Sequence, residues 1–169
     1  LMLLDNTEIR VLLLTDHIPL REVHCAVTSL EMVSSVELAT QSLAKHFGMK
    51  NPHIAVVGLN PHAGEIVEDP EEKTVIEPAV TILQKKDFKI EGPFPADSFF
   101  SIARKGGWDL IVSLYHDQGL IAAKYPGIDK VVNITLGLPY IRVSPGHGTA
   151  YDLVGKGTAD TRSFERAFR

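Results

Sequence analysis

The sequence has very little cysteine and no long apolar run. Cys25 is the only cysteine among 169 residues, so no disulfide can form within the chain. Proteins of reducing compartments typically lack disulfides. No stretch of apolar residues is long enough to cross a bilayer, and no signal-peptide pattern is present. We therefore expect a cytoplasmic protein that does not bind membranes.

Positive charge is also scarce. Seventeen Lys and Arg against 21 Asp and Glu give a net charge of −4, which provides no attraction for nucleic acid or for an anionic membrane surface. The hydrophobic content of 44% and the charged content of 22% are ordinary for a globular protein. The length suits one core or one lobe of a larger enzyme. Because residue 1 is leucine and a strand follows closely, we expect a trimmed chain or a fragment of something larger.

Apolar runs alternate with segments of helical periodicity. Continuous runs of Val, Leu and Ile predict strands buried on both faces, as in a parallel sheet covered by helices. We expect strands at residues 9–15, 53–59, 88–91, 109–115, 131–135 and 139–143, with a turn at Gly92-Pro93. We expect helices at residues 20–28, 30–47, 96–105, 150–155 and 161–168, and another that ends near residue 86. The acidic stretch 68–72 at the start of that helix would complement its dipole. The alternation predicts an α/β fold with a mainly parallel sheet flanked by helices.

Three of the predicted strands lead to a histidine. They are followed by His17, His62 and His116. Because the carboxyl ends of parallel strands meet at one edge of a sheet, where ligands gather, the three imidazoles should reach one edge. Three nitrogen ligands with an open fourth position suit a catalytic divalent metal. From spacing alone, ordinary loop histidines are an equally open interpretation.

Acidic residues stand beside each of these histidines. Asp16, Glu65 and Asp117 could orient the imidazoles as hydrogen-bond acceptors, or could cap the helices that follow. Any of them, Asp117 included, could serve as a general base. Three further histidines lie on predicted helices or at a strand start, where surface or packing roles are expected: His24, His46 and His53.

Polar residues after the third histidine suggest an anionic ligand. Lys124, Asn133 and Arg142 recur at nine-residue spacings, and Lys and Arg facing a metal site would suit a phosphorylated substrate. Isolated residues of these types are otherwise solvated surface groups. The loop His147-Gly148-Thr149-Ala150 could offer backbone N–H groups to a phosphate or cofactor, or could be a simple turn. No Gly-x-Gly-x-x-Gly follows a strand, so a dinucleotide would not bind in the doubly wound mode.

Five motifs occur in order across nearly the whole chain. They are Thr15-Asp16-His17-Ile18-Pro19-Leu20-Arg21, Asn60-Pro61-His62-Ala63-Gly64-Glu65, Tyr115-His116-Asp117-Gln118-Gly119, Asn133-Ile134-Thr135-Leu136-Gly137-Leu138-Pro139 and His147-Gly148-Thr149-Ala150. Together they resemble the 4-hydroxythreonine-4-phosphate dehydrogenase family of pyridoxine biosynthesis. The resemblance implies the fold of isocitrate and isopropylmalate dehydrogenases, with two α/β lobes around a cleft, in a homodimer with shared active sites. Family members are about twice as long, so the N-terminal lobe would be largely missing and residues 1–169 would form the metal-binding and substrate-binding portion.

The resemblance also implies residue roles and a reaction. A divalent metal (zinc, magnesium or cobalt) would have three histidine ligands, one of them from across the dimer: His17, His62 and His116. The substrate contacts would be Lys124, Asn133 and Arg142. The loop from His147 to Ala150 would line the site for NAD or NADP. The implied reaction is NAD(P)-dependent oxidation of 4-phosphohydroxy-L-threonine at C3, followed by decarboxylation to 3-amino-2-oxopropyl phosphate.

Other functions stay open, and the sequence departs from the family pattern in places. The alternatives are a related dehydrogenase of 4-phospho-threonate or erythronate, a truncated non-catalytic homologue that binds metal and dimerises, and a metal-dependent hydrolase. After Glu65, residues 66–70 replace a glycine-rich stretch of the family. Val143 and Gly146 stand where the family has threonine and aspartate. These departures concern the active-site loop and the expected cofactor site.

Overall fold

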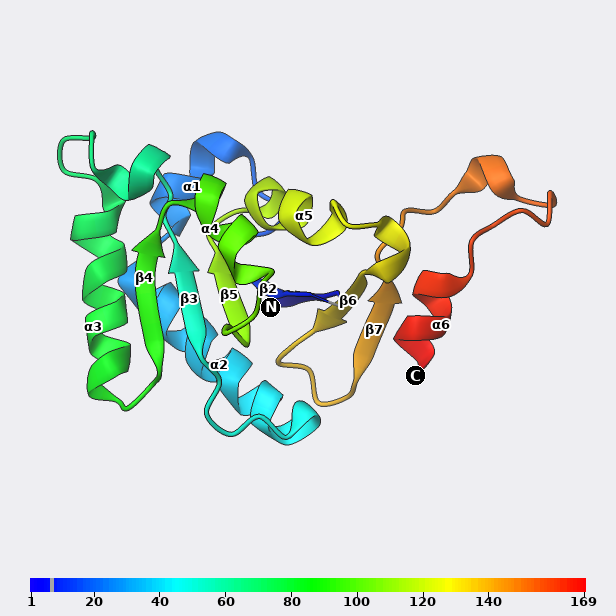
Figure 1. The fold of residues 1–169 in the computed structure, drawn as a ribbon, viewed down its shortest axis with the longest axis horizontal. Helices are drawn as coiled ribbons and strands as arrows, with labels where there is room; N and C mark the ends of the chain where they lie inside the picture. Colours follow the sequence, from blue (N-terminus) through cyan, green and yellow to red (C-terminus); the bar gives the residue numbers. More distant parts are fainter. Residues whose placement is uncertain (7) are drawn as a thin grey trace.

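The chain folds around one seven-stranded sheet (Figure 1). The computed structural model describes residues 1–6 and 8–169. The strand order is β4-β3-β5-β2-β1-β6-β7. The bounds are β1 Met2–Asp5, β2 Arg10–Leu13, β3 Ile54–Val57, β4 Ile90–Phe94, β5 Leu110–Ser113, β6 Val132–Thr135 and β7 Arg142–Pro145. β2, β5, β3 and β4 are parallel, whereas β1 is antiparallel to both β2 and β6, and β6 is antiparallel to β7.

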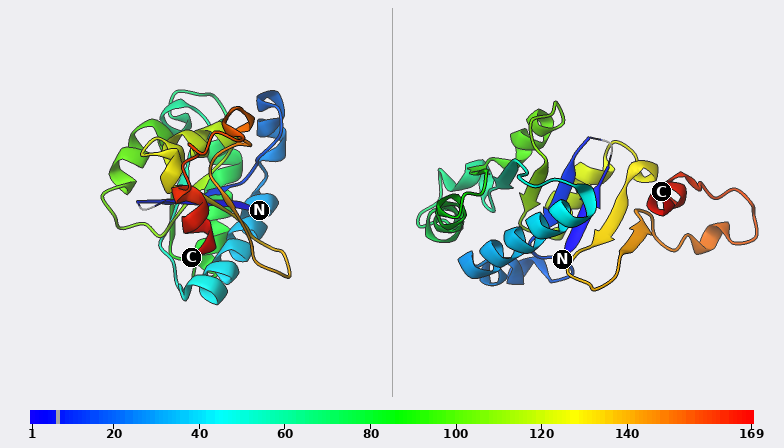
Figure 2. Two further views of the ribbon diagram at one scale, coloured as in Figure 1. Left: turned by 90° about the vertical axis from the view of Figure 1, so that its right-hand side faces the viewer. Right: turned by 90° about the horizontal axis from the view of Figure 1, so that it is seen from below.

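Helices cover both faces of the sheet. Their bounds are α1 Leu20–Ala26, α2 Ser29–Phe47, α3 Glu77–Lys85, α4 Ala96–Ala103, α5 His116–Lys124 and α6 Arg162–Phe168. A π-helix, Glu72–Ile76, runs directly into α3, and 3-10 turns occupy Pro61–Gly64, Ile128–Lys130 and Tyr151–Leu153. Beyond β7 the chain extends away from the sheet before α6 returns to it (Figures 1 and 2). In the described part of the chain, no helix is long and apolar enough to cross a membrane.

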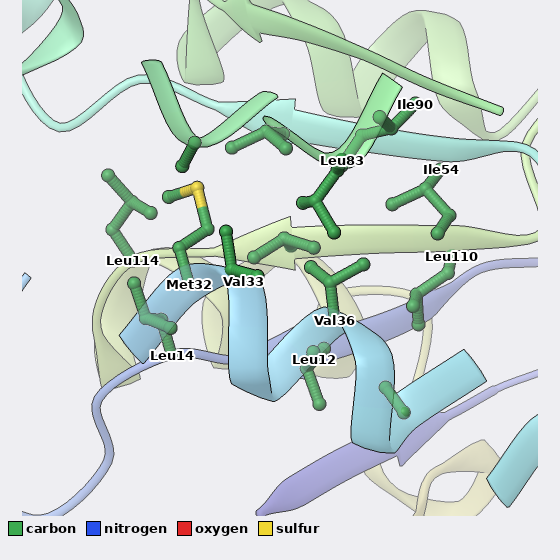
Figure 3. Packing of buried hydrophobic residues seen from close by; sticks show 14 of the residues in the cluster. Leu12, Leu14, Met32, Val33, Val36, Ile54, Leu83, Ile90, Leu110 and Leu114 are labelled. Carbon is green, nitrogen blue, oxygen red and sulfur yellow. The ribbon is translucent and has the colours of Figure 1, made fainter. Parts of the chain in front are cut away.

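Each face of the sheet has its own core. Alternate residues of a strand point to opposite faces, so on β2 Leu12 packs in the core that contains α1, α2 and α3, whereas Val11 packs in the core that contains α4 and α5. Figure 3 shows the first of these cores, where Val36 of α2 lies near Leu12 and Met32 of α2 lies near Leu14 and Leu114. Both faces of the parallel strands are therefore buried, which explains why their sequences are continuous apolar runs.

The predicted α/β architecture with a mainly parallel sheet is confirmed, although some bounds differ. The predicted turn at Gly92-Pro93 is wrong, because both residues lie within β4. β4 is an edge strand, where the missing N–H of proline is tolerated. The predicted strand 139–143 is shifted to Arg142–Pro145, since Arg142 pairs with Thr135 and the residues between them form the hairpin loop.

One strand and one α-helix have no residue range among the predictions. β1 lies at the very start of the chain and is inserted antiparallel between β2 and β6. α5 begins at His116 itself and has Gly119 in its interior, a residue that normally weakens helices. A Cβ added at Gly119 would lie 2.9 Å from Cγ1 of Val11 and 3.1 Å from Cβ of Ser113. The glycine thus allows α5 to pack closely on the sheet, which is a tertiary requirement.

The buried side of α2 should dominate its contribution to stability. Leu43 is 0% exposed and Leu30, on the same helix, is 80% exposed. We expect Leu43→Ala to lower the free energy of unfolding by about 2–5 kcal/mol through loss of packing, and Leu30→Ala to change it by about 0.5 kcal/mol or less. Urea unfolding of both variants measures this difference. Equal losses in the two variants would contradict the core described above.

Candidate functional site

The carboxyl ends of β2, β5 and β3 lie side by side at one edge of the sheet. β5 pairs in parallel with β2 on one side and with β3 on the other. His17 follows β2, His116 begins α5 just beyond β5, and His62 lies in the turn Pro61–Gly64 after β3. The structure thus places all three predicted histidines at the same edge of the sheet.

His17 and His116 come together at this edge. Their ring centroids are 5.3 Å apart, and both line a hollow of about 240 Å³ together with Asp16, Tyr115 and Asp117. The Asp16 carboxylate accepts a hydrogen bond of 2.6 Å from the backbone N–H of His17, and Asp117 Oδ1 lies 2.8 Å from His116 Nδ1. An imidazole held by a carboxylate at Nδ1 presents Nε2 as its free nitrogen, as metal-ligating histidines commonly do. This arrangement suits binding of a cation.

His62 does not join this pair within one chain. It is exposed and lines a neighbouring hollow of about 420 Å³ with Asp97 and Gln118, while Tyr115 borders both hollows. Glu65 contacts His62 through its backbone N–H, 3.3 Å from the His62 carbonyl oxygen. Within residues 1–6 and 8–169, no three His, Cys, Asp or Glu side chains form a group that could hold a metal ion.

Two of the predicted substrate residues lie on the face of the sheet that α5 covers. Lys124 ends α5, roughly 12 Å along the helix axis from His116 at its start. Asn133 pairs with Leu4 of β1, and Leu4 belongs to the core on the α5 face, so the Asn133 side chain points to that face too. Its Oδ1 is buried and has no hydrogen-bond partner among the described residues. Because buried acceptors are normally satisfied, this oxygen suits a ligand donor.

Arg142 lies at the same edge of the sheet as the histidines, as the pairing of the strands shows. It pairs with Thr135, which pairs with Met2, and Met2 pairs with Leu13 at the end of β2. The exposed guanidinium of Arg142 donates one hydrogen bond of 2.7 Å to Thr135 Oγ1. A guanidinium has five N–H donors, so others stay free for an anion.

The residue before the predicted cofactor loop is hydrogen-bonded to the last helix, α6. Residues 147–149 are exposed, and the loop leads into the 3-10 turn Tyr151–Leu153. The preceding Gly146 is buried, and its N–H donates to Ser163 Oγ of α6 at 2.9 Å. A Cβ added at Gly146 would lie 2.8 Å from both Cβ and the carbonyl oxygen of Val131. Close packing therefore requires a glycine where the family pattern has aspartate.

The groups with clear pKa shifts lie away from the sheet edge that carries His17, His62 and His116. Side-chain and backbone hydrogen bonds from Arg162 lower the pKa of Asp160 to about 2. A hydrogen bond from Arg104 lowers the pKa of Glu8. Both ion pairs are exposed: one lies within the segment before α6, and the other joins Glu8 to Arg104 at the end of α4.

The whole chain matches one protein family. The model of the family described as pyridoxal phosphate biosynthetic protein PdxA matches residues 1–169. The chain belongs to this family. The 4-hydroxythreonine-4-phosphate dehydrogenase of Xanthomonas axonopodis pv. citri is 44% identical over 167 residues, which are 98% of this chain and 52% of that protein. This chain therefore spans about half the length of the curated relatives it matches.

Solved structures agree with the PdxA family assignment. The structure of a putative 4-hydroxythreonine-4-phosphate dehydrogenase from Salmonella typhimurium superposes with a TM-score of 0.85 at 38% identity, over 99% of this chain and 51% of that one. Isocitrate dehydrogenase from Methylococcus capsulatus superposes with a TM-score of 0.59 at 17% identity, over 84% of this chain and 41% of that one. The second similarity concerns the fold alone. It confirms the predicted isocitrate dehydrogenase-like architecture.

Three residues at the site were not predicted to have a role there: Tyr115, Gln118 and Glu72. Tyr115 and Gln118 lie in the family motif around His116, so motif membership is the signal that could have found them. Glu72 belongs to the acidic stretch expected at the start of the helix, and it does lie in the first turn of the π-helix that leads into α3, but its contacts with the preceding loop were not predicted. Its side chain is buried and accepts hydrogen bonds from the backbone N–H groups of Leu59 and Asn60.

The packing at Gly146 can be tested directly. We expect Gly146→Ala to lower the free energy of unfolding by about 1–3 kcal/mol, because the added methyl group overlaps Val131. Gly148 is the matched control, since a Cβ there would meet nothing within 4 Å, and Gly148→Ala should change stability by about 0.5 kcal/mol or less. Urea unfolding compares the two. A neutral Gly146→Ala would show that the family's aspartate is absent for another reason.

Proposed function

We propose that this chain is the metal-binding and substrate-binding portion of an NAD(P)- and divalent-metal-dependent dehydrogenase. Its reaction would be oxidation of 4-phosphohydroxy-L-threonine at C3, followed by decarboxylation to 3-amino-2-oxopropyl phosphate, in pyridoxal phosphate biosynthesis. Membership of the family and the names of the relatives support this activity. The observation on this chain that carries the proposal is the pair of His17 and His116, with rings 5.3 Å apart at the carboxyl edge of parallel strands.

The donor set fits a divalent metal. The ligands would be His17 and His116 of one subunit and the equivalent of His62 from the second subunit of a homodimer, because His62 stands apart within one chain. Imidazole nitrogen suits zinc or cobalt, whereas magnesium prefers oxygen ligands. A metal bound there would supply Lewis-acid polarisation of the substrate's C3 oxygen.

Asp117 would have two tasks beside the bound substrate. Its Oδ1 contacts His116 Nδ1 and keeps that imidazole oriented. Its carboxylate is largely exposed, with 78% of the side chain accessible, so the second oxygen is available to take the C3 hydroxyl proton as a general base.

The remaining predicted residues would bind the substrate and the cofactor. Lys124 and Arg142 would attract the phosphate and carboxylate groups by their positive charge. The unpartnered Oδ1 of Asn133 would accept a hydrogen bond from the substrate. The exposed loop at residues 147–150 would line the site for NAD or NADP.

Two alternatives stand beside this activity. A related dehydrogenase of 4-phospho-threonate or erythronate would use the same charged contacts. A non-catalytic homologue would bind metal and dimerise without turning over any of these substrates. A metal-dependent hydrolase has no support from these relatives, which are named as dehydrogenases.

A turnover assay with a ligand variant tests the proposal. Loss of an outer-shell partner of a metal ligand typically lowers activity about 10- to 100-fold. Because His116 would be a ligand itself, we expect the rate of metal-dependent NAD(P) reduction with 4-phosphohydroxy-L-threonine to fall by more than about 100-fold in His116→Ala. His46→Ala is the matched control, because His46 is exposed in the last turn of α2 and does not line the hollow between His17 and His116. This control should keep the parent rate.

The same assay separates the alternatives. Faster turnover of phosphorylated threonate or erythronate would assign the related activity. If the parent turns over none of these substrates, yet binds zinc that is lost in His116→Ala, the chain is a non-catalytic homologue and the proposed activity is wrong. Turnover that persists in His116→Ala would contradict the metal assignment.

A further inference from the structure

We infer that Glu72 and Gln118 are positioning residues for His62. The inference rests on the proposed function, in which His62 is a metal ligand. Between β3 and His62 the chain passes through Gly58, Leu59 and Asn60. Glu72 and Gln118 form hydrogen bonds with peptide groups of these residues, and neither side chain is a proposed ligand of metal, substrate or cofactor.

Glu72 holds the loop through a buried carboxylate. The residue is 1% exposed. Its Oε1 accepts hydrogen bonds of 2.7 Å from the backbone N–H groups of Leu59 and Asn60, and its Oε2 accepts one of 2.9 Å from Asn60 Nδ2. A buried carboxylate is costly unless hydrogen bonds satisfy it. The loop therefore cannot move away without leaving this carboxylate unsatisfied.

The surroundings of Glu72 are shaped to admit its carboxylate. A Cβ added at Gly58 would lie 2.9 Å from Glu72 Oε1, and a Cβ added at Gly64 would lie 2.6 Å from Oε2. Both glycines thus leave the space that the carboxylate occupies. Glu72 also begins the π-helix Glu72–Ile76, a rare geometry that occurs mostly as single turns and often at functional sites.

Gln118 links the loop to the strand that leads to His116. Its Oε1 accepts hydrogen bonds from the Leu114 N–H at 2.8 Å and from Ser113 Oγ at 2.9 Å, at the end of β5. Its Nε2 donates a hydrogen bond of 2.8 Å to the Gly58 carbonyl oxygen at the end of β3. One side chain therefore fixes the two neighbouring strand ends that present His116 and His62.

The backbone of the loop requires such support. His62 and Ala63 have φ values of 54° and 52°, in the left-handed region that residues other than glycine seldom adopt. Such residues cluster at functional sites and persist only where surrounding contacts over-determine them. The hydrogen bonds of Glu72 and Gln118 supply those contacts just before the turn, and the turn leaves His62 exposed.

Cobalt binding tests the inference. We would titrate Co²⁺ into the parent chain, Glu72→Gln, Gln118→Met and a control, Asp5→Asn, with all proteins folded at the working temperature. Asp5 is also a buried carboxylate, but it pairs with Arg10 at the start of β2, at the opposite edge of the sheet. We expect Co²⁺ affinity to fall about 10- to 100-fold in Glu72→Gln and Gln118→Met and to stay unchanged in Asp5→Asn.

Amide hydrogen exchange provides a readout that needs no metal. In Glu72→Gln the amides of Leu59 and Asn60 should lose protection, while those within β3 keep it. Parent affinity for Co²⁺ in Glu72→Gln, or an equal loss in Asp5→Asn, would overturn the inference. If His62→Ala shows that the parent binds no metal through His62, the proposed metal site fails. The exchange data then decide alone, and unchanged protection of Leu59 and Asn60 overturns the inference.

Discussion

The parallel pairing of β2 with β5 and of β5 with β3 fixes where three strands end. Val11 lies opposite Ile111, and Ile54 lies opposite Leu110. This register brings the strand ends together, and the residues that follow them share one edge of the sheet. Two cores, one on each face, hold the strands in place. Disruption of this strand pairing would separate the histidines even if every side chain at the site were unchanged.

Within that edge, the site is divided between a close pair and a separate third residue. His17 and His116 face one hollow, and His62 lines the next one. Neighbouring side chains fix the strand ends that carry these histidines by hydrogen bonds to backbone groups. Gln118, for example, donates a hydrogen bond to the Gly58 carbonyl oxygen. If the three histidines form the proposed metal site, this division would leave each chain with an incomplete ligand set, which a second copy related by two-fold symmetry would complete.

The sequence predicts the parts of this architecture that depend on local patterns. Continuous apolar runs mark strands buried on both faces, so the three histidines could be placed at a sheet edge without a structure. The helical state of Gly119 depends on how closely α5 packs against Val11, a contact between distant segments. Burial of Glu72 likewise depends on N–H groups twelve or more residues away, and an acidic run otherwise indicates an exposed surface.

In the proposed dimer, each metal site would combine His17 and His116 of one chain with His62 of the other. Co-expression of His62→Ala chains with His116→Ala chains tests it most directly, with zinc bound per chain as the measurement. In a mixed dimer one site would be intact and the other would lack both residues, so random pairing should restore about a quarter of the parent's zinc. Zinc no higher than in either variant alone would contradict the shared site.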